Sequence, residues 1–163
     1  PFILRKALEQ TNIADAIGVI GGAHRASGTF YLIADSSGEV IGMETTATDY
    51  DILYAMNDYL GHTNHYVHPR LLPYDAPNRW LKTDTYVRWS RINKLLRRSC
   101  GRIGLDDLHV GYPRSICHHP EPGCSELEAE GTNASIIMDL KSLKLWLALG
   151  NPCQNEYAEY GFA

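Results

Sequence analysis

Short polar turns separate runs of β-branched and aromatic residues in this chain, and they determine which strands can pair. Thr29–Ala34 and Val40–Thr45 flank the turn sequence Asp35-Ser36-Ser37-Gly38, and this pattern predicts a β-hairpin. Near the end of the chain, Asn133–Leu140 and Leu143–Leu149 predict another hairpin. Strands joined by such short turns pair antiparallel, so the sequence favours antiparallel sheets.

A further hairpin is predicted in the middle of the chain. Ile52–Ala55 and Gly61–Val67 have strand character and are separated by Met56-Asn57-Asp58. Residues 68–82 and 111–131 are rich in proline or glycine and lack periodicity, which is typical of long surface loops.

Helical periodicity occurs on both sides of these strands. Pro1–Gln10 carries apolar residues at helical spacing, and Ile13–Ile20 predicts a second short helix that Thr11-Asn12 would cap. The strongest helical pattern is Thr83–Arg98, which begins with a capping Thr or Asp. Its apolar positions fall mostly on one face: Val87, Ile92, Leu95 and Leu96. Helices combined with antiparallel strand pairs predict a layered α+β fold.

Composition narrows the class of protein. The chain has 163 residues and is 44% hydrophobic, which is enough for one domain with a real core. Its net charge of −4, without a basic excess, gives no reason to expect a nucleic-acid partner. The apolar runs are far shorter than the roughly 20 residues that span a bilayer, so no membrane partner is expected. With no targeting signal visible, we expect a cytoplasmic protein.

The tetrapeptide His62-Thr63-Asn64-His65 is the strongest candidate for chemistry. On a strand, His62 and Asn64 would share one face, and Thr63 and His65 the other. An asparagine amide offers two N–H donors without charge, and it can stabilise the negative oxygen of an attacked carbonyl. The alternative is that Asn64 caps a strand end and the histidines are surface residues.

The spacing of the histidines and cysteines bears on whether the chain binds a metal or uses a thiol. His62, His65 and His68 are regularly spaced, but successive histidines three residues apart on a strand point to opposite faces, so no metal site is predicted. The four cysteines lack Cys-x-x-Cys spacing, and we expect thiols, with a bridge between Cys117 and Cys124 as the alternative. Cys117 lies beside histidines, yet a wall or structural role is favoured over a nucleophilic one.

The order of these motifs resembles the isopenicillin N acyltransferase-like cysteine peptidases. That family includes penicillin-forming acyl-CoA acyltransferases and hydrolases of carcinine or β-alanyl-dopamine. The likeness covers essentially the whole chain and rests most on Gly61-His62-Thr63-Asn64-His65 and Ser115-Ile116-Cys117-His118-His119. The other matching pieces are Pro1–Glu9, Tyr31–Asp35, Glu44, Thr132, Ser135–Asp139, Gly150–Cys153, Tyr157 and Tyr160.

The resemblance implies part of the αββα sandwich of N-terminal-nucleophile hydrolases, with antiparallel sheets. In that family a precursor cleaves itself before a cysteine, which then uses its own α-amine as the base. The cysteine attacks a small amide or acyl donor and passes the acyl group to water or an amine. No cofactor is implied, although an acyl-CoA is possible as co-substrate.

Carried over residue by residue, the resemblance implies that Asn64 is the catalytic oxyanion donor. It also implies that Thr63, His65, Ser115 and Thr132 lie at or near the substrate-binding pocket. An arginine that one branch of the family carries before the Thr132 position is replaced here by Ala129 or a neighbour, so that substrate contact is not expected.

The self-cleaving cysteine and the aspartate that follows it in the family have no counterpart in this sequence. We therefore expect residues 1–163 to be the C-terminal part of a single acyltransferase or hydrolase domain. Its partner would be the N-terminal part of the same precursor, which carries the nucleophile. The alternative is a non-catalytic remnant that binds a small ligand or a partner chain.

Overall fold

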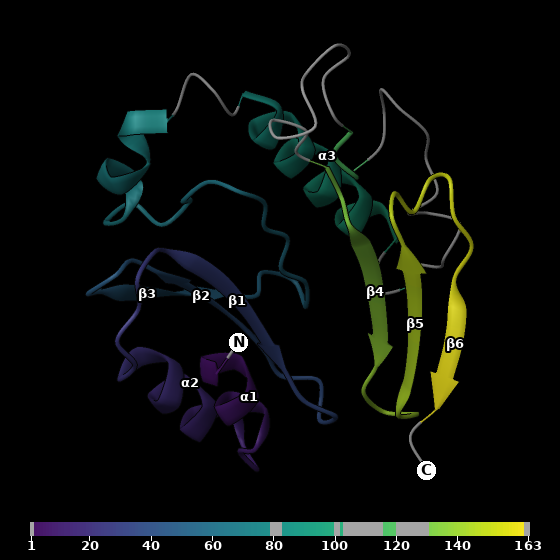
Figure 1. Ribbon diagram of the computed structural model, residues 1–163, viewed down its shortest axis with the longest axis horizontal. Helices are drawn as coiled ribbons and strands as arrows, with labels where there is room; N and C mark the ends of the chain where they lie inside the picture. Colours follow the sequence, from purple (N-terminus) through teal and green to yellow (C-terminus); the bar gives the residue numbers. More distant parts are fainter. Residues whose placement is uncertain (1, 79–82, 100–101, 103–115, 120–130, 162–163) are drawn as a thin grey trace. The chain divides into compact units, whose positions relative to one another are not determined.

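The computed structural model describes residues 2–78, 83–99, 102, 116–119 and 131–161 (Figure 1). The chain divides into two compact units, Pro1–Arg97 and Arg98–Ala163, and each is described by itself. Each unit contains a three-stranded antiparallel sheet. The chain is therefore α+β with antiparallel sheets, as its sequence predicts.

The sheet of the first unit has the strand order β1-β2-β3. Its strands are Thr29–Ala34, Val40–Thr45 and Tyr50–Tyr54. The first two form the predicted hairpin, in a register that pairs Thr29 with Thr45. The third strand pairs with β2, so β2 is the central strand.

Two helices cover one face of this sheet (Figure 1). They are α1 (Phe2–Leu8) and α2 (Ile13–Gly21), and Asn12 caps α2 by accepting the N–H of Asp15 at 2.9 Å. The buried core is Ala7, Ala16, Ile20 and Met43, with Ile3, Ile17, Val19, Tyr31, Ile33 and Ile52 packed against it. Because side chains alternate along a strand, Met43 faces the helices and Glu44 faces away from them.

The predicted hairpin in the middle of the chain is wrong. β3 pairs with β2, and none of residues 61–67, all of them described, belongs to a strand. Only a single bridge joins Met56 to Tyr59 across the turn. The physical reason is that side-chain oxygens of Glu44 and Thr85 accept backbone N–H groups of this segment, in place of a neighbouring strand.

The segment predicted as a loop at 68–82 contains a short 3-10 helix, η1 (Leu72–Asn78). After it, α3 (Thr83–Ser99) begins where the sequence predicts. The predicted apolar face is only partly right, because Val87 is exposed while Thr85 in the first turn is buried. None of the helices in the described ranges combines the length and apolar character needed to cross a bilayer.

The second unit contains a sheet with the strand order β4-β5-β6. Its strands are Ala134–Asp139, Lys144–Leu149 and Ala158–Gly161. The first two form the predicted hairpin, and Asp139 Oδ1 closes the turn by accepting the N–H groups of Lys141 and Ser142. No sequence pattern predicts β6, which is four residues long.

Candidate active site

A buried carboxylate anchors the segment 61–68, which we call the Asn64 loop. The Glu44 side chain is fully buried, and its Oε1 lies 2.6 Å from His62 Nε2. The two carboxylate oxygens also accept the backbone N–H groups of Val67 and His68, at 2.7 and 2.9 Å. Burial alone raises the pKa of Glu44, but the hydrogen bonds from His62 and from the backbone outweigh it and hold the pKa below its ordinary value. Glu44 is therefore an ionised anchor.

Aromatic contacts add to this anchor. The Phe30 ring stacks on the His62 ring with centroids 3.7 Å apart. Tyr66 donates its hydroxyl hydrogen to the carbonyl of Thr45 at 2.8 Å. This approach requires glycine at position 28, because a Cβ there would lie 2.0 Å from the Tyr66 hydroxyl oxygen. The Asn64 loop is thus packed directly onto β1 and β2.

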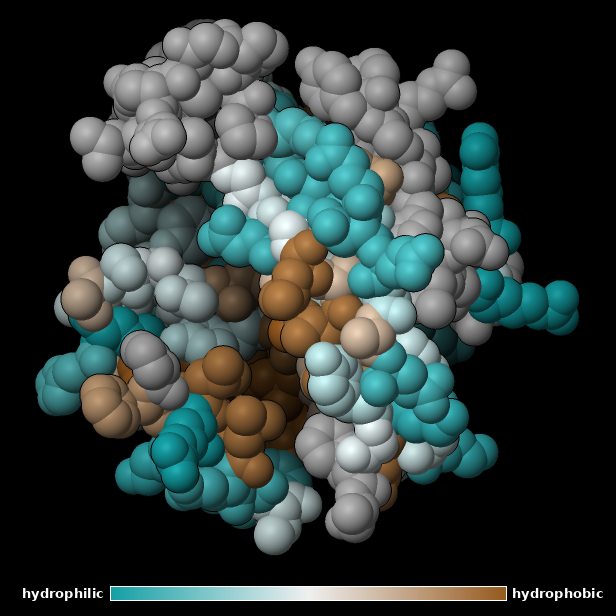
Figure 2. Space-filling model, turned by 45° about the vertical axis from the view of Figure 1, so that its right-hand side comes forward, coloured by the Kyte–Doolittle hydropathy of each residue, from teal (hydrophilic) through white to brown (hydrophobic). Residues whose placement is uncertain are grey.

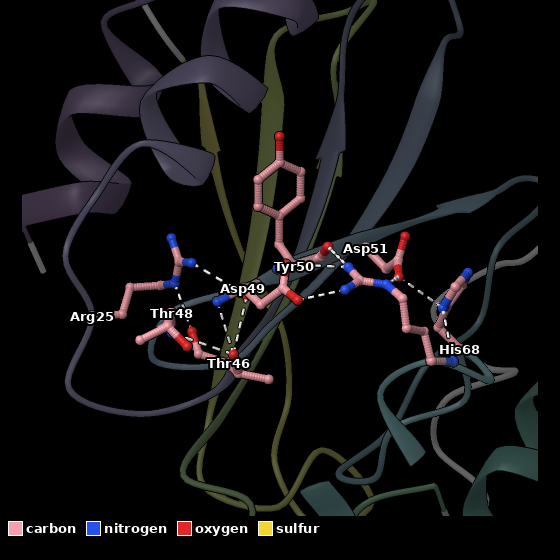
Figure 3. Close-up of polar contacts among 8 residues, drawn as sticks. Arg25, Thr46, Thr48, Asp49, Tyr50, Asp51 and His68 are labelled. Atoms are coloured by element: carbon pink, nitrogen blue, oxygen red, sulfur yellow. Dashed lines mark hydrogen bonds and ion pairs between the residues drawn. The ribbon is translucent and has the colours of Figure 1, made fainter. Parts of the chain in front are cut away.

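The end of the Asn64 loop is tied to the turn between β2 and β3 and to β3 (Figure 3). His68 Nδ1 lies 3.0 Å from a carboxylate oxygen of Asp51. Arg70 forms ion pairs with Asp49 and Asp51 and donates to the carbonyl of Tyr50. These contacts fix the point at which the chain leaves the sheet towards η1.

Arg25 binds the same turn from the other side, as Figure 3 shows. Its guanidinium donates to the carbonyls of Thr46 at 2.8 Å and Asp49 at 3.3 Å. It also donates to the carbonyls of Ile20 and Ala23, at the end of α2. Arg25 therefore adds donors to carbonyls at the end of α2 and joins that end to the turn between β2 and β3.

Thr85, in the first turn of α3, positions the centre of the Asn64 loop. Its Oγ1 accepts the backbone N–H of Asn64 at 2.8 Å and lies 3.1 Å from His65 Nδ1. Its carbonyl accepts the hydroxyl hydrogen of Thr63 at 3.0 Å. Thr85 is fully buried, so these contacts are shielded from water. Thr63 thus has a structural contact inside the protein.

The side chain of Asn64 is oriented by Arg88. Arg88 Nη2 lies 2.9 Å from Asn64 Oδ1, and Arg88 Nε forms an ion pair with Asp84 at 2.8 Å. Because a guanidinium has only donors, the amide atom that faces it must be the oxygen. The opposite end of the amide, Nδ2, is then the donor end. Asn64 itself is exposed.

A cavity of about 720 Å³ lies beside this arrangement, within the first unit. Its wall is mainly apolar and aromatic, and His65 belongs to it. The Tyr86 hydroxyl donates to Asp75 at 3.4 Å, which adds a polar feature to the wall. The lining residues are His65, Tyr66, Val67, Leu72, Asp75, Tyr86, Trp89 and Ser90. A site of this size and lining can hold a small organic ligand.

His65 connects the cavity to the Asn64 loop. Its ring packs against Tyr86, with centroids 4.5 Å apart, and lies near Trp89. Burial lowers the pKa of His65, since it disfavours the imidazolium more than nearby Asp75 favours it. His65 is therefore a neutral wall residue. The three regularly spaced histidines contact different residues: His62 contacts Glu44, His65 contacts Thr85 and His68 contacts Asp51.

The remaining predicted residues do not belong to the first unit. Ser115 lies outside the described residues, and so does Cys124. In the second unit, Thr132 Oγ1 accepts the N–H of His118 at 2.8 Å, and the Thr132 N–H donates to the His118 carbonyl at 3.0 Å. Thr132 thereby fastens the segment 116–119.

Cys117 is buried in the second unit, and its sulfur lies 3.3 Å from that of Cys153. Burial and the contact with Cys117 raise the pKa of the Cys153 thiol. This is the opposite of the change that activates a nucleophilic cysteine.

Sequence reasoning proposed Asn64 as a site residue but missed the contacts that Thr85 and Arg88 make with it. The four-residue spacing of Asp84 and Arg88 indicates an ion pair on a helix face, and the structure contains that pair. Their link to Asn64 crosses 24 residues of sequence, and a local pattern has no information on such a contact.

Comparison with known proteins adds one finding. The model of the family described as acyl-coenzyme A:6-aminopenicillanic acid acyl-transferase matches residues 1–154. Curated proteins gave no significant match. The matched range includes the Asn64 loop, its anchors in β2 and α3, and the segments around Cys117 and Cys153. This chain therefore belongs to the acyl-coenzyme A:6-aminopenicillanic acid acyl-transferase family.

Proposed function

We propose that this chain forms part of an enzyme that hydrolyses a small amide or transfers an acyl group through a cysteinyl thioester. The orientation of the Asn64 amide is the observation that carries the proposal. The substrates would be acyl-amines or acyl-CoA thioesters, and no cofactor is needed.

Asn64 would supply an oxyanion donor. The contact with Arg88 fixes Oδ1, so the Nδ2 hydrogens are available to a substrate oxygen that becomes negative during attack. The backbone N–H of Asn64 is held by Thr85, which limits movement of the residue as a whole. A donor that is oriented before the substrate binds needs no reorganisation during the reaction.

The cavity beside Asn64 would bind the acyl group. Its aromatic wall, which includes Tyr86 and Trp89, suits an apolar or aromatic acyl chain. His65 lines the cavity and directly follows Asn64, so an acyl group bound there would have its carbonyl close to the Asn64 loop. Thr63 would act by holding the loop, while Ser115 and Thr132 remain proposed substrate contacts.

The nucleophile would come from an N-terminal part of the same precursor, released by autoproteolysis. One face of the second sheet is apolar, and this supports the proposal that a further layer of structure covers it. Cross-strand pairing places Ile136 with Leu147 and Met138 with Leu145 on one face, and Ile136 and Met138 are 55% and 60% exposed. An apolar sheet face normally packs against a second layer. We propose the αββα sandwich of N-terminal-nucleophile hydrolases as the complete fold.

The test is the turnover of the complete precursor with Asn64→Ala. We expect kcat to fall by about 100-fold or more, since one oxyanion donor is lost. Asn93→Ala is the matched control, because the Asn93 amide donates to the carbonyl of Trp89 one turn earlier in α3, away from Asn64. Near-normal turnover in Asn64→Ala, with the fold intact by circular dichroism, would remove Asn64 from the oxyanion hole.

A second candidate is a non-catalytic module that binds a small acyl compound. The observation in its favour is that the described residues lining the cavity all belong to the first unit. Calorimetric titration of this chain with an acyl-CoA or an N-acyl amine distinguishes the two. Tight binding by the chain, together with a complete precursor that turns over neither compound, would favour the binding module.

A further inference from the structure

Two thiol sulfurs and one imidazole nitrogen converge in the second unit. Cys117 Sγ lies 3.3 Å from Cys153 Sγ, and His119 Nε2 lies 3.2 Å from each of these sulfurs. The atoms thus form a nearly equilateral triangle built from two segments, about 35 residues apart in the sequence. The sequence lacks a Cys-x-x-Cys motif, and the spacing of its cysteines and histidines does not predict this cluster.

The two segments are held together by backbone contacts as well. Asn151 donates its amide N–H to the carbonyl of His118 at 2.7 Å. Thr132 binds both the N–H and the carbonyl of His118. The carbonyl of Asn151 in turn accepts from Gln154 N–H and from Asn155 Nδ2. The peptide between Cys117 and His119 and the turn that bears Cys153 are therefore positioned without help from the sulfurs.

Two close thiols can form a disulfide or bind a metal ion, and the position of the His119 imidazole distinguishes these two cases. A disulfide requires sulfurs about 2.05 Å apart and gives a histidine nitrogen no role. Here His119 Nε2 is equidistant from both sulfurs, which is the arrangement of three ligands around a common centre. In a tetrahedral zinc site, with Zn–S of about 2.3 Å and Zn–N of about 2.0–2.1 Å, neighbouring ligand atoms lie about 3.5–3.8 Å apart. The observed triangle would need to open by only a few tenths of an ångström.

We propose that Cys117, His119 and Cys153 bind one zinc ion. The two thiols lose their protons when they bind, so each zinc taken up releases two protons to solvent, and neutral His119 binds through Nε2. Three protein ligands leave the fourth position of zinc for water or another group. The ion would cross-link the segment 116–119 to the turn after β5, and it would stabilise this small unit.

The test uses the whole chain, reduced with a phosphine, loaded with zinc and dialysed, and then analysed for metal content. We expect one zinc per chain in the wild type and its loss in Cys117→Ser and His119→Ala. His118→Ala is the matched control, since it keeps the backbone atoms that bind Thr132 and Asn151 and removes an imidazole outside the triangle. Zinc retained in both ligand variants, or absent from the wild type, would overturn the proposal.

A measurement on the wild type alone guards against variants that fail to fold. Alkylation of the reduced chain, mapped by mass spectrometry, should label Cys117 and Cys153 without zinc and lose that labelling when zinc is added. Labelling of these two cysteines that zinc leaves unchanged would also overturn the proposal. Neither readout depends on acyl transfer, so failure here leaves the proposed function standing.

Discussion

Glu44 is a charged group that the fold can bury because three donors are directed at its carboxylate. A buried carboxylate without partners would lose its hydration without replacement. Here His62 and the backbone N–H groups of Val67 and His68 replace the water. The lowered pKa of Glu44 means that the folded protein favours the ionised form more than the unfolded chain does. Glu44 therefore stabilises the fold when ionised, and it couples that stability to the Asn64 loop.

We predict that Glu44→Gln lowers the free energy of unfolding by about 2 kcal/mol at neutral pH, since charge-assisted hydrogen bonds are lost. The wild-type advantage should be complete well above the ordinary pKa of 4.5 and should shrink as the pH falls through the lower folded pKa. Urea unfolding at a series of pH values measures this, with exposed Glu39→Gln as the control. A difference that stays constant down to acidic pH would contradict this account.

For Asn64, the sequence predicts the chemistry of the side chain but not the contacts that orient it. Its amide could be proposed as an oxyanion donor from the motif, because the residue type carries that chemistry. Which end of the amide points away from Arg88, and is thus free to meet a substrate as proposed, depends on Arg88, and the position of the residue depends on Thr85. Both are long-range contacts, and a local pattern does not encode them.

Secondary-structure elements with local signals were predicted well, and the Asn64 loop was not. The hairpins of β1 with β2 and of β4 with β5 follow from alternation and turn residues, and α3 begins at Thr83, where the helical pattern starts. The loop has a strand-like composition, but its N–H groups bond to side chains of Glu44 and Thr85, 20 or more residues away. Periodicity cannot distinguish a strand from a segment held by such distant acceptors.

The contact between the Asn64 loop and the sheet depends on one glycine. We predict that Gly28→Ala lowers the free energy of unfolding by about 1–3 kcal/mol, because the added Cβ overlaps Tyr66 and the Thr45 carbonyl. Gly18→Ala in α2 is the matched control: nothing lies within 4 Å of its Cβ, and helix propensity should stabilise it by about 0.5–1 kcal/mol. Thermal melting of both variants tests this. Equal melting temperatures would show that the Tyr66 contact is not tight.

Large apolar side chains are exposed to solvent in both units of the molecule, among them Leu32, Val87, Ile136 and Met138. Figure 2 shows apolar side chains gathered at the surface beside hydrophilic ones. In the second sheet, the face that bears Ile136 and Met138 continues through Leu145 and Leu147 to Ala158 and Tyr160. Its opposite face carries the ion pair of Lys144 with Glu159. That opposite face also bears Ile137, Trp146 and the fully buried Ala148, so the face with Ile136 and Met138 is the one left exposed for a packing partner.

We predict that this chain, purified alone, self-associates through the apolar face of its second sheet. The double variant Ile136→Thr/Met138→Thr should shift it towards monomer in sedimentation velocity, because exposed apolar area drives association and threonine is compatible with a strand. Val87→Thr, which removes a similarly exposed apolar side chain from α3, is the control and should change nothing. If the proposed N-terminal part of the precursor covers this face, its co-expression should also abolish self-association. A wild-type chain that stays monomeric at every concentration would mean that the face needs no partner, and it would favour the binding module over the enzyme fragment.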